Sequence, residues 1–175
     1  MTHQDRVNLI KAGVGSPAGL WADLGSGEGA FTLALAELLH PPAEIYSIEK
    51  DQNRLNEQKQ EFRIQFPDLF VHFIRKDFTR DLRLPPLDGI IMANSLHYIS
   101  NKKKLIRRVR SYLKNQGYFL LVEYHVKQVN PWVPHPISFK EWNDLAKLTG
   151  FRETRLIGTH PSRYQHEIYA ALSQT

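Results

Sequence analysis

The chain has 175 residues, of which 42% are hydrophobic, and its formal net charge is +5. This length and composition are typical of one globular domain with a sizeable core. No apolar run approaches the roughly 18 residues of a membrane span, and residues 1–6 are not the core of a signal peptide, so we expect a cytoplasmic protein without a membrane partner. There is no cysteine, which excludes disulfides and thiolate chemistry, and the histidines have no metal-ligand spacing, so no metal site is predicted.

Strand and helix patterns alternate along the chain, with glycine and proline residues between them. Ser138 and Glu141 form a capping-box pattern that marks the start of the last helix. In chain order we expect a helix over residues 3–13, a strand over 20–24, a helix over 29–40, a strand over 44–49, a helix ending at Pro67, strands over 70–75 and 88–93, a helix over 101–115, a strand over 117–123, a helix over 138–150 and strands over about 151–158 and 165–172.

This order of elements predicts an α/β fold. We expect a single Rossmann-like, three-layer sandwich with helices on both faces of a mostly parallel, seven-stranded sheet. The last two strands are joined by a turn containing Pro161 and Ser162, so they should form an antiparallel hairpin at the end of the sheet.

The most informative segment is residues 21–29, Trp-Ala-Asp-Leu-Gly-Ser-Gly-Glu-Gly, where a buried strand runs into a glycine-rich turn. Its glycines stand at alternate positions, so the backbone is free to adopt unusual dihedral angles and to approach a ligand closely. The N–H groups of the helix that follows attract a negatively charged or carboxylate-bearing ligand. Glu49 ends the next strand, where a carboxylate is placed to accept hydrogen bonds from ribose hydroxyls. Together these features predict a site for a nucleoside cofactor.

The glycines alone do not identify the cofactor, because Gly25-x-Gly27-x-x-Ala30 also satisfies a relaxed dinucleotide fingerprint. Two details argue against a dinucleotide. Asp23 adds a negative charge from which a pyrophosphate gains nothing, and Gly29 fills a position that the dinucleotide pattern leaves free. An acidic residue at the start of the turn suits a cofactor with a cationic amine and no phosphate, such as S-adenosylmethionine.

The segment from Asp23 to Gly29 resembles the first motif, acidic-x-Gly-x-Gly-x-Gly, of the class I S-adenosylmethionine-dependent methyltransferases. The resemblance covers nearly the whole chain. Glu49 stands at the family's ribose position, Asp77-Phe78 matches its adenine motif, and residues 93–98 resemble the run that closes its fourth strand. The resemblance implies that S-adenosylmethionine is bound by Asp23, Gly25, Ser26, Gly27, Gly29, Glu49, Lys50, Asp77, Phe78 and Asn94, with Asp51 as the next candidate for the ribose.

The same resemblance divides the single domain, residues 1–175, into three parts. An N-terminal helix and linker occupy residues 1–19, a cofactor-binding core occupies 20–125, and an acceptor-side loop, helix and hairpin occupy 126–175. We expect a monomer or a homodimer.

A sulfonium already activates its methyl group, so transfer mainly requires an acceptor O, N or C atom held in line behind the methyl carbon. A general base is needed only if the acceptor must lose a proton. His97, after the strand over 88–93, is the first candidate catalytic residue, and Glu123, at the end of the strand over 117–123, is the second, with His125 behind them. Each also has a structural interpretation, His97 as a helix cap and Glu123 as half of an ion pair.

The predicted helix over 101–115 carries seven basic residues and no acidic one, namely Lys102, Lys103, Lys104, Arg107, Arg108, Arg110 and Lys114. Such a face could bind RNA phosphates. Only Tyr112 is available among them for base stacking, which favours a solvated face instead. We therefore expect a methyltransferase with a small-molecule substrate. The alternatives are an RNA-modifying methyltransferase that uses the basic helix 102–114, and a protein that binds S-adenosylmethionine without turnover.

Overall fold

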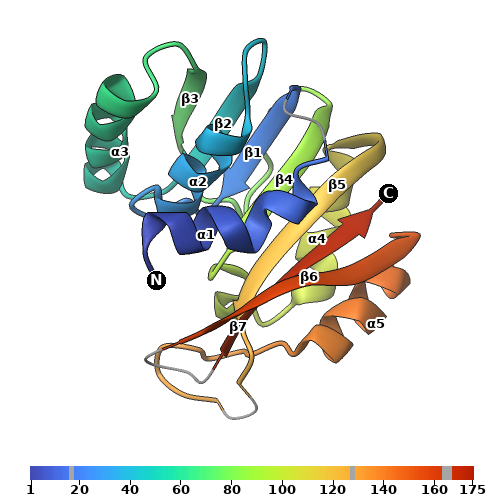
Figure 1. Cartoon of the computed structure of the whole chain (residues 1–175). Coiled ribbons are helices and arrows are strands. Elements are labelled where there is room, and N and C mark those ends of the chain that lie inside the picture. The colour runs from blue at the N-terminus through green and yellow to red at the C-terminus, as the bar shows by residue number, and fades with distance from the viewer. Residues whose placement is uncertain (16–17, 127–128, 163–166) are drawn as a thin grey trace.

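The protein is built around one seven-stranded sheet with the strand order β3-β2-β1-β4-β5-β7-β6 (Figure 1). The computed structural model describes residues 1–15, 18–126, 129–162 and 167–175. Five neighbouring strands are parallel, and β7 lies antiparallel between β5 and β6. The predicted α/β fold with a terminal antiparallel hairpin is confirmed. The strands are β1 (Leu20–Leu24), β2 (Glu44–Glu49), β3 (Phe70–Arg75), β4 (Leu87–Ala93), β5 (Leu113–Tyr124), β6 (Glu153–Pro161) and β7 (Glu167–Gln174).

Helices cover both faces of the sheet, so the molecule has three layers (Figure 1). Side chains alternate along each strand; Ile90 packs in the cluster that contains α4 and α5, whereas Ile91 packs in the cluster that contains α1, α2 and α3. Both isoleucines are fully buried. None of the helices in the described ranges has the length and apolarity to cross a membrane. The helices are α1 (His3–Ile10), α2 (Ala30–Leu38), α3 (Gln52–Gln65), α4 (Lys102–Ser111) and α5 (Phe139–Thr149), with short 3₁₀ turns η1 (Lys11–Gly13) and η2 (Leu96–Tyr98).

The predicted helix over 101–115 is wrong at its C-terminal end. The helix ends at Ser111, and β5 begins at Leu113, which pairs with Leu87 of β4. A register shift follows in β4, and Gln116 has a φ of 65°, so residues 114–116 form an irregular start to the strand. Their polar composition resembles the last turn of a helix, but pairing with a strand distant in sequence decides their conformation. Lys114 therefore leaves the basic helix, and its Nζ lies 2.8 Å from a carboxylate oxygen of Asp88.

The terminal hairpin is longer than predicted. Pro161 belongs to β6, where it pairs with Glu167, and is not part of the turn. The predicted start of the last strand at residue 165 lies outside the described residues, and β7 continues to Gln174 because this end of the strand pairs with Tyr118 of β5.

The parallel strands β1, β2, β3, β4 and β5 all end at one edge of the sheet, where open α/β sheets bind ligands. The glycine turn, Glu49, Asp77, Asn94 and Glu123 follow or end these strands, so the topology brings residues distant in sequence to one edge.

Candidate cofactor site

A cavity of about 730 Å³ lies at this edge of the sheet. It is lined by the loops that follow β1, β2, β3 and β4 and by the first turn of α2. All of the predicted cofactor residues except Gly29 line it. Its full lining comprises Arg6, Asp23, Gly25, Ser26, Gly27, Ala30, Phe31, Glu49, Lys50, Asp51, Arg54, Lys76, Asp77, Phe78, Thr79, Ala93, Asn94, Ser95, Tyr98 and Ile99.

The three glycines of the turn have positive φ angles of 80°, 58° and 84°, which L side chains rarely adopt. A Cβ on Gly25 would lie 2.9 Å from Phe78 and from Ser95, and a Cβ on Gly29 would lie 2.7 Å from the side chain of Gln58. A Cβ on Gly27 would meet only a guanidinium nitrogen of Arg54, at 3.8 Å. Gly25 and Gly29 therefore allow the protein to pack, whereas Gly27 leaves open the space that a ligand can occupy.

Glu49 holds the glycine turn in place. Its Oε2 accepts the backbone N–H of Gly27 at 3.0 Å, and its Oε1 accepts the N–H groups of Lys50 and Asp51 at 2.8 and 3.0 Å. The side chain is buried, yet it lines the cavity. Asp51, the second ribose candidate, caps α3 by accepting the N–H groups of Asn53 and Arg54. Glu49 is thus the carboxylate that joins the turn to the end of β2.

Gln58 is a functional residue that the sequence analysis missed. It is buried on α3, and its Nε2 donates to the carbonyl of Gly27 at 2.6 Å and to Oγ of Ser26 at 2.9 Å. Its Oε1 lies 2.7 Å from Oγ of Ser47. A signal was present in the sequence, because Gln58 stands between Leu55 and Phe62 on the one stripe of α3 that is buried.

Asp23 is the least satisfied charged group in the cavity. The residue is 1% exposed; its Oδ2 accepts the hydroxyl of Thr32 at 2.7 Å, and Oδ1 is buried with no hydrogen-bond partner among the described residues. Burial raises the pKa of this carboxyl from 3.8 to about 7, and the negative charge of Glu49 adds to the rise. A cationic group placed against Oδ1 would supply the missing partner.

The loops after β3 and β4 form the other walls. Burial acts to raise the pKa of Asp77, but hydrogen bonds from Thr79 and the charge of Lys50 outweigh it, and the pKa lies below its usual value. Phe78 lies against the glycine turn. Asn94 has a φ of 50°, donates its N–H to the carbonyl of Val122, and has a buried Oδ1 without a partner in the described part of the chain.

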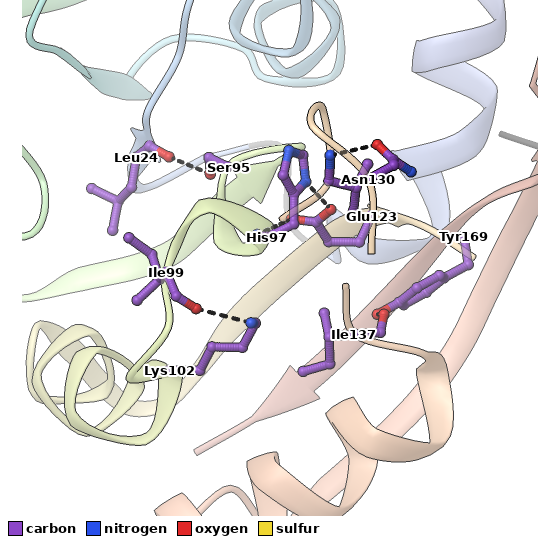
Figure 2. Close-up of polar contacts among 10 residues, drawn as sticks. Leu24, Ser95, His97, Ile99, Lys102, Glu123, Asn130, Ile137 and Tyr169 are labelled. Carbon is purple, nitrogen blue, oxygen red and sulfur yellow. Dashed lines mark hydrogen bonds and ion pairs between the residues drawn. The ribbon is translucent and has the colours of Figure 1, made fainter. Parts of the chain in front are cut away.

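The structure brings together the two predicted catalytic residues, but behind the cavity wall. Nδ1 of His97 lies 2.6 Å from Oε2 of Glu123, and the backbone N–H of His97 donates to Oε1 at 3.0 Å (Figure 2). Both side chains are at most 2% exposed, and neither lines the cavity. The His97 ring lies 4.3 Å from the ring of Tyr98, which does line the cavity and is 60% exposed. His125 also lies outside the cavity lining.

Three cations of the basic helix are half-buried and bound to backbone carbonyls. Lys102 donates to the carbonyl of Ile99 (Figure 2), Arg108 to that of Thr79 and Arg110 to that of Gly150. A shallow cavity of about 340 Å³, lined by residues that include Arg80, Lys104 and Arg108, adjoins the main cavity at Thr79 and Ile99.

These residues fit a zwitterionic nucleoside. An unpaired carboxylate oxygen at Asp23 matches an ammonium group, the carboxylate of Glu49 matches ribose hydroxyls, and Gly27 leaves the backbone open to close approach. Asp23 and Glu49 place two carboxylates beside the glycine turn, an arrangement that repels a pyrophosphate.

The comparisons with known proteins identify the family of the chain. A family model described as a methyltransferase domain matches residues 21–169. The chain belongs to this family, and its domain is of the class I S-adenosylmethionine-dependent methyltransferase type.

Solved structures share the fold at low sequence identity. YcgJ from Bacillus subtilis is 15% identical with a TM-score of 0.78, and 99% of each chain is covered. Magnesium protoporphyrin IX methyltransferase from Synechocystis, with bound S-adenosylhomocysteine, is 17% identical with a TM-score of 0.78 over 98% of this chain and 83% of the other. A methyltransferase from Aquifex aeolicus is 16% identical with a TM-score of 0.75 over 97% and 89%.

One curated relative is the hybrid PKS-NRPS synthetase lepA of Aspergillus flavus, which is 25% identical over 179 residues. The match covers 87% of this chain but only 4% of the synthetase. The chain therefore spans a small fraction of the length of this relative.

Gly27→Ala and Gly29→Ala form a matched pair of tests. Each variant places a Cβ at positive φ, at a cost of about 1–2 kcal/mol in stability. We expect Gly27→Ala to weaken S-adenosylhomocysteine binding at least tenfold, because its Cβ enters the cavity. Gly29→Ala should lower the melting temperature further but bind within a few-fold of the native chain, as measured by titration calorimetry. Equal affinities for both variants would show that Gly27 does not face the ligand.

Asp23→Asn should stabilise the ligand-free protein at high pH. The carboxyl has a pKa of about 7 when folded and 3.8 as an unperturbed group, so the folded state keeps a proton that the unfolded state has lost. Its contribution to stability is present below pH 3.8 and is lost as pH rises through 7. The free energy of unfolding of the variant should therefore exceed that of the native chain increasingly between pH 4 and 8, by about 2–4 kcal/mol at the upper end.

Denaturant unfolding at several pH values measures this difference. The same variant should bind S-adenosylhomocysteine at least tenfold more weakly, because a neutral amide replaces the partner of the ammonium group. A stability difference that does not change with pH would show that Asp23 is ionised in the folded protein like a solvated carboxyl.

Proposed function

We propose that the protein transfers the methyl group of S-adenosylmethionine to a small-molecule acceptor at an O, N or C atom, mainly by holding the two in line. One observation supports the proposal above the others: a single cavity of about 730 Å³ is lined by the predicted cofactor residues and also by Tyr98 and Ile99, which the cofactor assignment does not use. Two solved structures of the same fold are named for small-molecule substrates. They are magnesium protoporphyrin IX methyltransferase and mitomycin 7-O-methyltransferase.

The cofactor supplies a methyl group that its sulfonium has already activated. Asp23 would accept from the ammonium group, Glu49 from the ribose hydroxyls, and Asp77 and Phe78 would contact the adenine. On the acceptor side, the exposed ring of Tyr98 lines the cavity and is available to orient a small molecule. Positioning of this kind can account for much of the rate of a bimolecular transfer.

The contacts of the buried pair of His97 and Glu123 favour a structural role, in which the pair holds the part of the cavity wall that contains Tyr98. Glu123 binds both the ring and the backbone N–H of His97, and the carbonyl of His97 accepts the N–H of His135 from the acceptor-side loop. The ring of Tyr98 rests on that of His97. A general base must reach the acceptor, and the ring of His97 does not line the cavity. The general-base role of His97 therefore stays a prediction.

The RNA-modifying alternative is less well supported. Three of the basic residues of α4 are bound to backbone carbonyls, so Lys103, Lys104 and Arg107 provide most of the exposed charge of the helix. Binding without turnover is the other alternative, and only an assay of the product separates it from the proposal.

Release of S-adenosylhomocysteine in the presence of a panel of small phenols, amines, carboxylic acids and activated carbon acids tests the proposal. We expect turnover with at least one of these classes and only weak, salt-sensitive retention on RNA. The double variant Lys103→Ala/Arg107→Ala should keep the small-molecule activity. Turnover on RNA alone, with loss in that double variant, would favour the RNA alternative, and cofactor binding without turnover on any acceptor would favour a binding protein.

His97→Ala separates the two roles of the buried pair. If His97 is the base, kcat should fall by about 10²–10⁴-fold and its pH profile should change, because the proton moves in the transition state. If the pair holds Tyr98, the loss should be about tenfold or less, should fall mainly on the acceptor KM, and should recur in Tyr98→Ala. The variant removes the imidazole partner of the buried Glu123 and leaves only the backbone N–H, at a cost of up to about 3–5 kcal/mol, so the melting temperature is the required control.

A further inference from the structure

Arg6 lines the cofactor cavity and adds a positive charge to it, although it lies far from the glycine turn in sequence. It belongs to α1, in the part of the chain that precedes the sheet, and it lines the cavity with Ala30 and Phe31 of α2. Among the described residues, no carboxylate lies within ion-pair distance of its guanidinium. A cation that is partly buried at a cavity wall without a protein partner is available to a ligand.

The position of α1 is determined by contacts with two neighbours. Nε2 of His3 lies 2.6 Å from a carboxylate oxygen of Glu37 in α2, and Nε2 of His160 in β6 lies 3.4 Å from Asp5. Val7 is buried in the same cluster as Phe31. Because these contacts flank Arg6 in sequence, they place it on the α2 side of the cavity.

The N-terminus of α2 lies at this same side of the cavity. Its cap residue is Gly29, which supplies no side-chain cap, and no acidic residue occupies the first turn. Ala30 and Phe31 line the cavity, so unpaired N–H groups of the first turn are present at its wall. Thr32, in the same turn, binds Asp23, whose Oδ1 is buried and unpartnered. One end of the cavity thus presents an unpaired carboxylate oxygen beside two features that attract an anion.

We propose that Arg6 binds the carboxylate of the amino-acid portion of S-adenosylmethionine, together with the N-terminus of α2, while Asp23 binds its ammonium group. The proposal rests on the cofactor assignment above and adds α1 to the site. Of the other cations of the cavity, Lys50 and Lys76 come from the loops after β2 and β3. Arg54 belongs to α3, and its guanidinium lies 3.8 Å from the position of a Cβ on Gly27, so it approaches the glycine turn from the β2 side, opposite α1 in the chain order of the sheet. A guanidinium suits this role because it can bind a carboxylate through two parallel hydrogen bonds.

Titration calorimetry with two probes tests the proposal on the full chain. The probes are S-adenosylhomocysteine and its decarboxylated analogue, which keeps the amine, the thioether and the nucleoside. We expect Arg6→Ala to bind S-adenosylhomocysteine at least tenfold more weakly than the native chain and to bind the analogue within about twofold. Arg6→Lys should recover part of the loss, because it keeps the charge but not the paired geometry.

Arg54→Ala is the matched control, since it removes another cation of the same cavity. Its effect should be the same for both probes. Equal losses for both probes in Arg6→Ala, or no loss for either, would overturn the proposal, and melting temperatures show whether α1 remains folded. A native chain that binds neither probe would instead overturn the cofactor assignment, and the proposal with it.

Discussion

The site depends on a buried carboxylate that the fold does not fully satisfy. Asp23, Glu49 and Glu123 end or nearly end three parallel strands, and each is at most 7% exposed. Glu49 accepts three backbone N–H groups, and Glu123 binds the ring and N–H of His97. Among the described residues Asp23 has only the hydroxyl of Thr32 as a partner, which leaves one oxygen unpaired, and burial raises its pKa to about 7. Of the three, Asp23 alone requires a ligand to complete its hydrogen bonding.

Two sets of buried polar residues hold the walls of the site, Glu49 with Gln58 and His97 with Glu123. Glu49 and Gln58 fix the backbone on two sides of Gly27, so the turn is preorganised before a ligand arrives. His97 and Glu123 form a buried hydrogen-bonded pair, and the centre of the His97 ring lies 4.3 Å from that of Tyr98. In the function that we propose, the first of these regions would hold the cofactor and the second would hold the acceptor, as catalysis by positioning requires.

Features set by local sequence were predictable, and features set by long-range packing were not. The glycine turn, the position of Glu49 and the order of strands and helices follow from spacing and periodicity, and the fold is confirmed. The end of α4 at Ser111 was not predictable, because it depends on the pairing of β5 with β4. Gln58 was recognisable only as a polar residue on a buried stripe. Arg6 had no local signal, since its place in the cavity results from the docking of α1 on α2.

We infer that the unpaired carboxylate of Asp23 and the open glycine turn form a site for a zwitterionic nucleoside and not for a dinucleotide. The most direct measurement is the melting temperature of the full chain with S-adenosylmethionine, S-adenosylhomocysteine, NAD and NADP in turn. A ligand that binds only the folded state raises the melting temperature. We predict a rise with the first two and none with the last two; stabilisation by NAD alone would contradict the account.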